Sequence, residues 1–320
     1  MALDIGRKGW VGVGVESSYG APVAITDYIP FNENSLKGMS EKVANEAAYG
    51  VRERVFDSVI AKQWAEGDVS INVDSKLFGY FLYSALGTNS PANVAGAVYD
   101  HTMSRNNSVT PKSLTIVNDR VVDRQYVTGA AVKSLNISVS DGLASAQASI
   151  LGKYPITTTS GTLTTTSGSI FSFKDNFFAF AATPSAALSA TNLKPSELTI
   201  NIENNSEPVF RHGSAGVDAI VHKEFEVTAE GTLFFENTTD RDAYYNNTKQ
   251  GAAMKLTGAG IGGGYSEAVT LNMYRVQMES WELETGLADF YAEKFSLRCE
   301  YDNANSKSFD AIIRNTKTSY

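Results

Sequence analysis

Apolar and polar residues alternate with a period of two through most of the chain. In residues 68–74, Val69, Ile71 and Val73 share one side of an extended strand, and polar residues occupy the other side. The same alternation recurs in residues 135–140, 144–150 and 197–203. Strands that bury one face and expose the other are typical of antiparallel sheets, so the pattern predicts a mainly β protein.

Two segments instead carry the pattern of a short helix. Residues 75–86 place their leucines and phenylalanines on one helical face, with Asp74 or Ser75 as the N-cap and Gly87 as the C-cap. Residues 239–250 begin with a Thr-Asp capping pattern and are followed by a glycine. The chain is therefore expected to hold few helices among many strands.

Both predicted helices lie within the same order of elements. An Ala-Glu-Gly sequence and a strand precede each helix, at residues 65–67 and 229–231. A Gly-Leu-Ala turn follows later in each case, at residues 142–144 and 286–288. The repeated order predicts an internal duplication; the alternative is two chance turns in a β-rich chain.

The duplication divides the chain into two tandem β domains, residues 1–156 and residues 170–320. Residues 157–169 between them are rich in Ser, Thr and Gly and have no apolar face, which predicts an exposed linker or hairpin. Residues 37–54, 88–110 and 206–222 are expected to be loops longer than a compact domain needs.

The net charge of −8 is concentrated in the second half of the chain. Residues 1–155 carry 15 acidic and 14 basic side chains, whereas residues 156–320 carry 20 and 13. An acidic surface argues against tight binding to nucleic acid, which requires Lys and Arg. No apolar run approaches the roughly 20 residues of a membrane helix, and no signal segment follows Met1, so no membrane association or export is expected.

The sequence lacks the patterns of common catalytic and metal sites. The three histidines have no partner at metal-binding spacing, and His101 and His212 are expected in solvated loops. Cys299 is the single cysteine and is expected to be a small, half-buried strand residue. The acid pairs at 240/242 and 282/284 are better explained by a helix N-terminus and a strand face than by a catalytic dyad. We therefore expect no enzymatic activity, no cofactor and no metal.

The glycine-rich stretch near the N-terminus, GWVGVGVESSYGAP at residues 9–22, raises the question of a phosphate-binding loop. Gly12 and Gly14 begin like a dinucleotide-binding fingerprint, but Ser17 replaces the third glycine, and no helical pattern follows. A short strand over residues 10–15, with small residues that allow close packing, is the better interpretation.

Residues 9–22 resemble the N-terminus of tail tube (major tail) proteins of long-tailed bacteriophages, the siphophages. Further matches are the Tyr-Ile-Pro sequence at residues 28–30, the charged stretch 37–54, and the Ala-Glu-Gly sequence followed by a strand and a helix. The resemblance covers about the first 90 residues. Beyond them it rests on the strand pattern and the Gly-Leu-Ala turns.

The resemblance implies a β-sandwich or barrel with a short flanking helix, assembled into rings that stack as a hollow tube. It implies a virion protein of the tail, assembled in the host cytoplasm, with the tape-measure protein and passing DNA in the lumen and tail terminator and tail-tip proteins as further partners. A duplicated chain would form a trimeric ring with pseudo-six-fold symmetry, and otherwise the ring would be hexameric.

Two sets of residues are candidates for roles in such a tube. The mixed charges suited to contacts between subunits or rings are Glu41, Lys42, Glu46, Arg52, Glu53 and Arg54, unless this stretch is a mobile solvent loop. The polar strand positions suited to the lumen are Asp68, Asn72, Asp74, Glu197, Asn201 and Glu203, unless these faces lie on the outside. A different function, that of a carbohydrate-binding or virion decoration module, would draw on the 15 tyrosines and 3 tryptophans. An enzyme with an unrecognised site is the third alternative.

Overall fold

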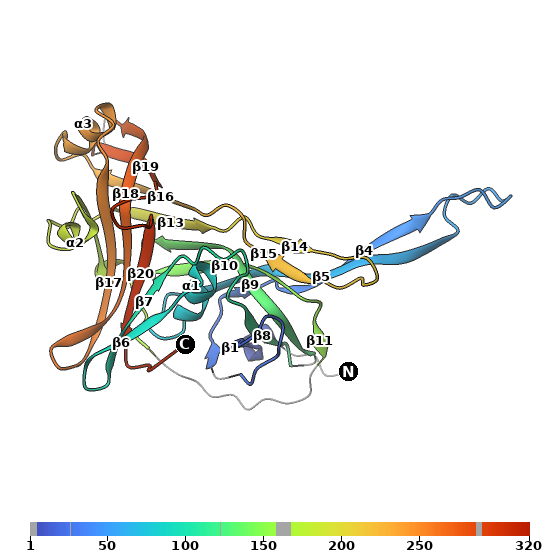
Figure 1. Ribbon diagram of the computed structural model, residues 1–320. Coiled ribbons are helices and arrows are strands. Elements are labelled where there is room, and N and C mark those ends of the chain that lie inside the picture. The colour runs from blue at the N-terminus through green and yellow to red at the C-terminus, as the bar shows by residue number, and fades with distance from the viewer. Residues whose placement is uncertain (1–4, 26, 122, 158–167, 286–289) are drawn as a thin grey trace.

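The protein is built mainly from antiparallel strands, with a few short helices (Figure 1). The computed structural model describes residues 5–25, 27–121, 123–157, 168–285 and 290–320. The prediction of a mainly β protein is thus confirmed.

The first half of the chain contains the strands β1 (Trp10–Val15), β2 (Asp27–Ile29), β3 (Glu33–Asn34), β4 (Lys37–Asn45), β5 (Asp57–Asn72), β6 (Ser90–Ala95), β7 (Val98–Ser104), β8 (Leu114–Asp119), β9 (Arg124–Val139), β10 (Ser145–Gly152) and β11 (Ile156–Thr157). Its helices are the 3-10 turn η1 (Gly6–Lys8) and α1 (Gly79–Leu86).

The second half contains the strands β12 (Asn176–Ala181), β13 (Glu197–Glu203), β14 (Glu207–Val209), β15 (Ala219–Val221), β16 (Glu226–Phe234), β17 (Gln250–Gly262), β18 (Tyr265–Glu284), β19 (Ala292–Cys299) and β20 (Phe309–Asn315). Its helices are the 3-10 turn η2 (Phe173–Asp175), α2 (Pro184–Ala187) and α3 (Thr239–Tyr245).

The strands of the two halves pair in the same spatial order. In the first half the order is β1, β8, β9, β10, β5, β4. In the second half it is β12, β17, β18, β19, β16, β13. A 3-10 turn precedes the first strand of each series, and α1 and α3 follow the corresponding strands β5 and β16. The repeated order seen in the sequence therefore has a counterpart in the strand pairing.

The halves are joined by hydrogen-bonded strands rather than by the chain alone. Strand β13 of the second half pairs with β9 of the first, from Leu198 opposite Val139 to Glu203 opposite Ser134. We call this pairing the internal joint. Asn204, directly after β13, donates from its side-chain nitrogen to the carbonyl oxygens of Ala85 in α1 and Val132 in β9. Strand β20 also pairs with both β18 and β7.

The apolar faces of the paired strands surround α1 and form with it a single large core that spans both halves. Phe81 and Leu82 of α1 and Phe78 directly before it are fully buried in this core, as are Ile137 of β9 and Ile200 of β13. Because the alternation of residue types has the period of a strand, strands such as β13 and β19 contribute every second side chain to this core. Burial of this apolar surface is the main stabilising contribution to the fold.

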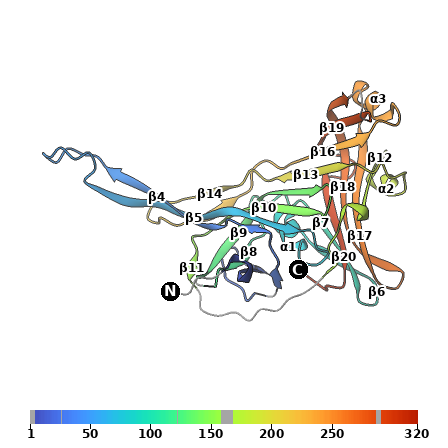
Figure 2. The same cartoon turned by 180° about the vertical axis from the view of Figure 1, so that it is seen from behind.

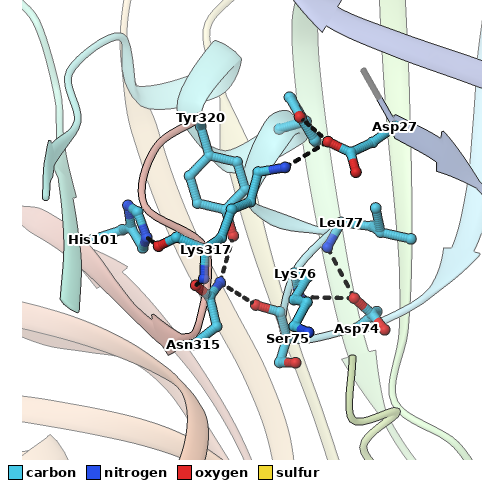
Figure 3. A network of polar contacts seen from close by, with 10 residues as sticks. Asp27, Asp74, Ser75, Lys76, Leu77, His101, Asn315, Lys317 and Tyr320 are labelled. Atoms are coloured by element: carbon cyan, nitrogen blue, oxygen red, sulfur yellow. Dashed lines mark hydrogen bonds and ion pairs between the residues drawn. The ribbon is translucent and has the colours of Figure 1, made fainter. Parts of the chain in front are cut away.

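The C-terminal residues pack back against the first half (Figure 3). The ring of Tyr320 lies edge-on to those of Tyr80 and His101, at centroid distances of 5.2 and 4.8 Å. The side-chain nitrogen of Asn315 donates to the Ser75 carbonyl oxygen and to the Tyr320 hydroxyl. Segments that are far apart in the sequence thus close one side of the core together.

The long hairpin of β4 and β5 projects well beyond the rest of the molecule, as both views show (Figures 1 and 2). Its strands remain paired from Lys37 opposite Glu66 to Asn45 opposite Asp57. We refer to residues 42–61 of this hairpin as the arm. At the corresponding place in the second half, β14 and β15 form a shorter hairpin that folds against the first half, where Val217 and Ile220 pack with Ala131 and Leu151.

Several local predictions need correction. The predicted loops 37–54, 88–110 and 206–222 are not loops throughout, because they contain the paired strands β4, β6, β7, β14 and β15. His101 lies buried in β7 rather than in a solvated loop. The first helix begins at Gly79 and ends at Leu86, where Gly87 has the predicted left-handed C-cap conformation, and the second helix ends already at Tyr245. Pairing with another strand stabilises the strands in these segments. The local sequence pattern does not reveal such pairing, because it describes only neighbouring residues.

Other predicted features are confirmed or lie outside the described residues. The strand over residues 10–15 is confirmed as β1, and Cys299 is a buried strand residue. Most of the predicted linker, residues 158–167, and the second Gly-Leu-Ala turn are outside the described part of the chain.

Candidate assembly surfaces

One face of the sheet is polar across both halves of the chain. The pairing registers align residues of successive strands from β5 to β18 into rows that cross the internal joint. One row consists of Ser70, Gln147, Asn136, Asn201, Thr228, Arg298 and Gln277. The adjacent row, which points into the core, consists of Ile71, Ala146, Ile137, Ile200, Ala229, Leu297 and Met278. We call the first of these two surfaces the polar face.

Carboxylates outnumber cations on the polar face. Its acidic residues include Asp68, Glu197, Glu203, Glu226, Glu230, Glu282 and Glu284, and its basic residues include Lys294 and Arg298. These two cations are paired with acids, since Lys294 bonds to Glu284 at 2.6 Å and Arg298 to Glu279. The hydrogen bond with Glu284 raises the pKa of Lys294. The polar face therefore has a net negative charge.

The polar face is hollowed where the second half contributes its central strands. A depression of about 450 Å³ lies over Glu197, Glu230, Glu282 and Lys294. The short side chains of Thr199, Thr232, Ser280 and Ser296 line the same depression. An open, shallow and hydrophilic surface of this kind has neither the depth nor the apolar lining of a typical small-molecule pocket.

Five of the six residues predicted from sequence for a lumen lie on the polar face: Asp68, Asn72, Glu197, Asn201 and Glu203. Asp74 does not belong with them, because it is buried beyond the end of β5. One of its carboxylate oxygens accepts hydrogen bonds from the backbone nitrogens of Lys76 and Leu77, at 2.7 and 2.9 Å. Burial raises the pKa of Asp74. Its role is to terminate the strand and start the turn that leads into α1 (Figure 3).

The charged residues predicted for contacts between subunits all lie on the arm or directly before it, and all are exposed. They are Glu41, Lys42, Glu46, Arg52, Glu53 and Arg54. Within the arm, Arg54 pairs with Glu46 at 3.2 Å, and at its base Lys62 pairs with Glu41 at 3.3 Å. Exposed pairs of this kind contribute little to stability.

The arm also carries apolar side chains that the charge pattern obscured in the sequence. Its exposed apolar residues are Val43, Tyr49, Val51, Val55, Phe56, Val59 and Ile60. The rings of Tyr49 and Phe56 stack with centroids 4.0 Å apart across the tip, and Phe56 remains 64% exposed. A concentration of exposed apolar residues on a projecting hairpin is typical of a surface that is covered by a partner.

The N-terminal glycine-rich motif is organised around the buried carboxylate of Glu16. One carboxylate oxygen accepts from the Gly20 backbone nitrogen and the Ser113 hydroxyl, and the other from the Thr115 hydroxyl and the Gly129 backbone nitrogen. Glu16 thereby ties the turn after β1 to strands β8 and β9. The motif has a structural role, which sequence reasoning about a phosphate loop did not reveal.

A family model described as "Phage tail tube protein" matches residues 6–286, a range that includes this motif, the arm and the polar face except for the part that β19 contributes. The chain belongs to the phage tail tube protein family. The match confirms the resemblance seen in residues 9–22 and identifies a structural component of a phage virion tail. No match to this tail tube protein was found among curated proteins.

Among the described residues of this tail tube protein, no group of three or more His, Cys, Asp and Glu side chains could hold a metal ion. Within the same part of the chain, no helix is long and apolar enough to cross a membrane. The histidines have structural surroundings: His101 bonds to the Lys317 carbonyl oxygen, and His222 to the Ser206 hydroxyl. Burial raises the pKa of the Cys299 thiol, which disfavours the reactive thiolate.

Proposed function

We propose that this protein self-assembles into rings that stack into the hollow tail tube, through which DNA is delivered to the host. The observation that carries the proposal is the polar face, which continues without interruption from the first half of the chain to the second across the internal joint. A sheet that curves around a channel needs such a face on its inner side, because DNA and water pass along it.

The equivalent strand orders support a ring in which each chain contributes two similar domains. Three copies would then supply six domains, and each contact between copies would resemble the internal joint. In the internal joint, β13 pairs with the edge of β9. The strand that corresponds to β13 is β4, because each is the last strand in the order of its half. The strand that corresponds to β9 is β18, whose C-terminal part continues beyond its pairing with β17. We propose that β4 of one copy extends the sheet at β18 of the next.

The polar face is proposed to line the lumen. Its carboxylates repel the phosphate backbone, so DNA would slide along the wall without adhering to it. The pairing of Lys294 and Arg298 with nearby acids removes the cations that would hold DNA in place. The tape-measure protein would occupy the same channel before DNA does, and tail terminator and tail-tip proteins would contact the ends of the tube.

The arm is proposed to contact a neighbouring copy or the next ring. Its apolar residues would then be covered in the assembly, and the charges of Glu46 and Arg54 would select the partner surface. Its length and its distance from the core fit a segment that stabilises an assembly more than the isolated chain (Figure 2).

Negative-stain electron microscopy of the purified protein over a range of concentrations tests self-assembly. We expect rings or long hollow tubes, and symmetry averaging of end views should resolve six similar domains from three chains.

The double variant Tyr49→Asp/Phe56→Asp should remain folded by circular dichroism but form few or no tubes. The matched control Val109→Asp, which changes an exposed apolar residue outside the arm, should assemble normally. Small monodisperse particles of the wild-type protein at every concentration would overturn the proposal.

A further inference from the structure

The internal joint ends in a side chain that lies between the end of α1 and the edge of β9. Asn204 is the first residue after β13 and is buried. Its side-chain nitrogen donates to the Ala85 carbonyl oxygen at 2.9 Å and to the Val132 carbonyl oxygen at 3.1 Å. The strand that joins the two halves is thus anchored by a polar side chain beside the end of a helix.

In the second half, a groove of about 450 Å³ lies between α3 and the edge of β18. We call it the α3 groove, and its lining residues are Tyr244, Tyr245, Asn247, Gln277, Met278 and Glu279. Within the described residues, the side of β18 that pairs with β17 has no partner strand beyond Val276. The α3 groove therefore lies beside the part of β18 that is open to another strand.

The ends of the two helices correspond to each other. Ala85 lies two residues before Gly87, the C-cap of α1, and Tyr244 lies two residues before Asn246, the C-cap of α3. The two helices also follow the corresponding strands β5 and β16. Tyr244 in the wall of the α3 groove is therefore the counterpart of Ala85.

The strand positions beside the two helices correspond as well. In the first half, one row across β5, β10 and β9 consists of Gly67, Ile150 and Val132. In the second half, the row across β16, β19 and β18 consists of Gly231, Phe295 and Trp281. The Ala-Glu-Gly sequences, which end at residues 67 and 231, match the two rows. Trp281, whose ring lies 6.2 Å from that of Tyr245, is therefore the counterpart of Val132.

The residue of β4 that corresponds to Asn204 is Lys42. Leu198 of β13 and Leu36, directly before β4, lie opposite the glycine of the Ala-Glu-Gly sequence in their halves. Both leucines are buried in the main core. Lys42 follows Leu36 by six residues, as Asn204 follows Leu198. If β4 pairs with β18 as β13 pairs with β9, Lys42 arrives at the α3 groove.

The chemistry of the α3 groove suits a lysine side chain. The carbonyl oxygens at the C-terminal end of α3 attract a cation. The Glu279 carboxylate already pairs with Arg298, but a carboxylate has room for a further donor. The rings of Tyr244 and Tyr245 can pack against the apolar stem of a lysine. Within the described residues, the exposed ammonium group of Lys42 has no ion pair, so it is available for this contact.

The same alignment places Glu41 of β4 opposite Glu282 of β18. Each of these carboxylates has a cation beside it, because Lys62 pairs with Glu41 at 3.3 Å and Lys294 lies opposite Glu282 in β19. These cations offset the repulsion between the two acids, and Lys42 adds a third positive charge at the contact.

We propose that Lys42 of one copy of this chain docks in the α3 groove of a second copy. Both views show the arm, which begins at Lys42, and α3 at opposite ends of the molecule, so the two cannot meet within one chain (Figures 1 and 2). This inference rests on the proposed pairing of β4 with β18 and states which residues anchor it. Each copy has one Lys42 and one α3 groove, so the contact can repeat head to tail around a closed ring.

Site-specific cross-linking tests this contact. Lys42→Cys is combined with Tyr245→Cys, and assembled material is treated with a short bifunctional maleimide; the native Cys299 is buried and does not compete. Denaturing electrophoresis should show a ladder of covalent oligomers that ends at the trimer if three chains form the ring. Each single-cysteine variant should yield no ladder. Tubes of the double-cysteine variant that yield no ladder overturn the docking while leaving the proposed tube intact.

The concentration required for ring formation gives a second measurement, which needs no cross-linker. Lys42→Glu should raise this concentration by about tenfold without changing the unfolding temperature of the unassembled chain, because Lys42 is exposed there. Lys42→Arg should assemble almost as the wild type does. The matched control Lys174→Glu, at an exposed position in η2, should have no effect.

Combining Lys42→Glu with Glu279→Lys tests whether the two side chains meet. Glu279→Lys alone should also raise the concentration required for ring formation, and the double variant should need clearly less than the product of the two increases. An unchanged threshold in Lys42→Glu, or increases that simply multiply, would overturn the docking. If the wild-type chain forms no rings at any concentration, both this inference and the proposed function fail.

Discussion

The ammonium group of Lys317 lies 2.5 Å from a carboxylate oxygen of Asp27, although 290 residues separate them in the sequence. Both side chains are largely removed from solvent, and Figure 3 shows the ammonium group pointing to the Asp27 carboxylate. The Tyr80 hydroxyl also donates to this carboxylate. Burial alone would lower the pKa of Lys317, but the hydrogen bonds with Asp27 and Tyr80 outweigh it and raise the pKa. The pair links the C-terminal residues to strand β2.

Removing either partner of this pair should be strongly destabilising. Lys317→Met leaves Asp27 as a buried carboxylate without its cation, and we expect a loss of about 3 kcal/mol in the free energy of unfolding. Asp27→Asn should have a similar effect. The double variant should lose clearly less than the sum of the two, because it leaves no unpaired charge. Urea unfolding of the four proteins measures this coupling, and additive losses would contradict the prediction.

The buried carboxylate of Glu16 should be essential for the stability of the first half. Glu16→Ala leaves two backbone nitrogens and two hydroxyl groups without their acceptor, which should cost about 3 kcal/mol or more. The control Glu33→Ala, at an exposed position in β3, should change the stability by less than about 0.5 kcal/mol. Thermal unfolding at low protein concentration makes the comparison, and equal effects of the two variants would refute the role of Glu16.

The stability of the protein should fall as the pH drops below 6.5, in part because of His222. Burial lowers the pKa of this histidine from 6.5 to about 4 in the folded protein. Between these values the unfolded chain binds a proton that the folded chain does not, so acidification favours unfolding. Wild type should lose about 2 kcal/mol from this group between pH 6.5 and 4.5 relative to His222→Gln. Parallel pH profiles of the two proteins in urea unfolding would contradict this.

Glu293 should have the opposite dependence on pH. Burial raises the pKa of its carboxyl group, although the Trp281 ring nitrogen donates to it at 2.8 Å. Its contribution to stability is therefore present at low pH and is lost as the pH rises through the raised pKa. Glu293→Gln should stabilise the protein at pH 7 and have little effect at pH 4. The exposed control Glu282→Gln should show no such difference, and a loss of stability at pH 7 in Glu293→Gln would contradict the prediction.

Neutralising the polar face should impair DNA delivery without changing tube length. We expect phage that carry Glu197→Gln, Glu203→Gln, Glu226→Gln and Glu230→Gln together to lose infectivity per particle by about tenfold, because DNA would adhere to the wall. Tail length in micrographs should be unchanged. The matched control, Asp141→Asn with Glu224→Gln, neutralises exposed acids at turns and should retain infectivity. Normal infectivity of the fourfold variant would mean that this face does not line the lumen.

The local alternation of residue types was sufficient to predict most strand faces correctly. Ile71, Ile200 and their polar neighbours occupy the predicted sides of β5 and β13, because the side-chain direction in a strand depends only on the position along it. The position of Asp74 was predicted wrongly because the strand ends at Asn72, after which the alternation no longer decides the direction. In the arm, charged and apolar residues are mixed, so the sequence suggested a polar loop where paired strands extend.

By itself, the sequence determined the mainly β composition, the repeated order of elements, the absence of recognisable catalytic motifs and the resemblance in residues 9–22. Only the tertiary structure decided that both polar strand faces belong to one surface, that Glu16 is a buried acceptor, and that Lys317 meets Asp27. The physical reason is the separation in sequence over which each kind of interaction acts. Alternation and caps depend on residues a few positions apart, whereas strand order, register and buried polar pairs depend on which distant segments the core brings together.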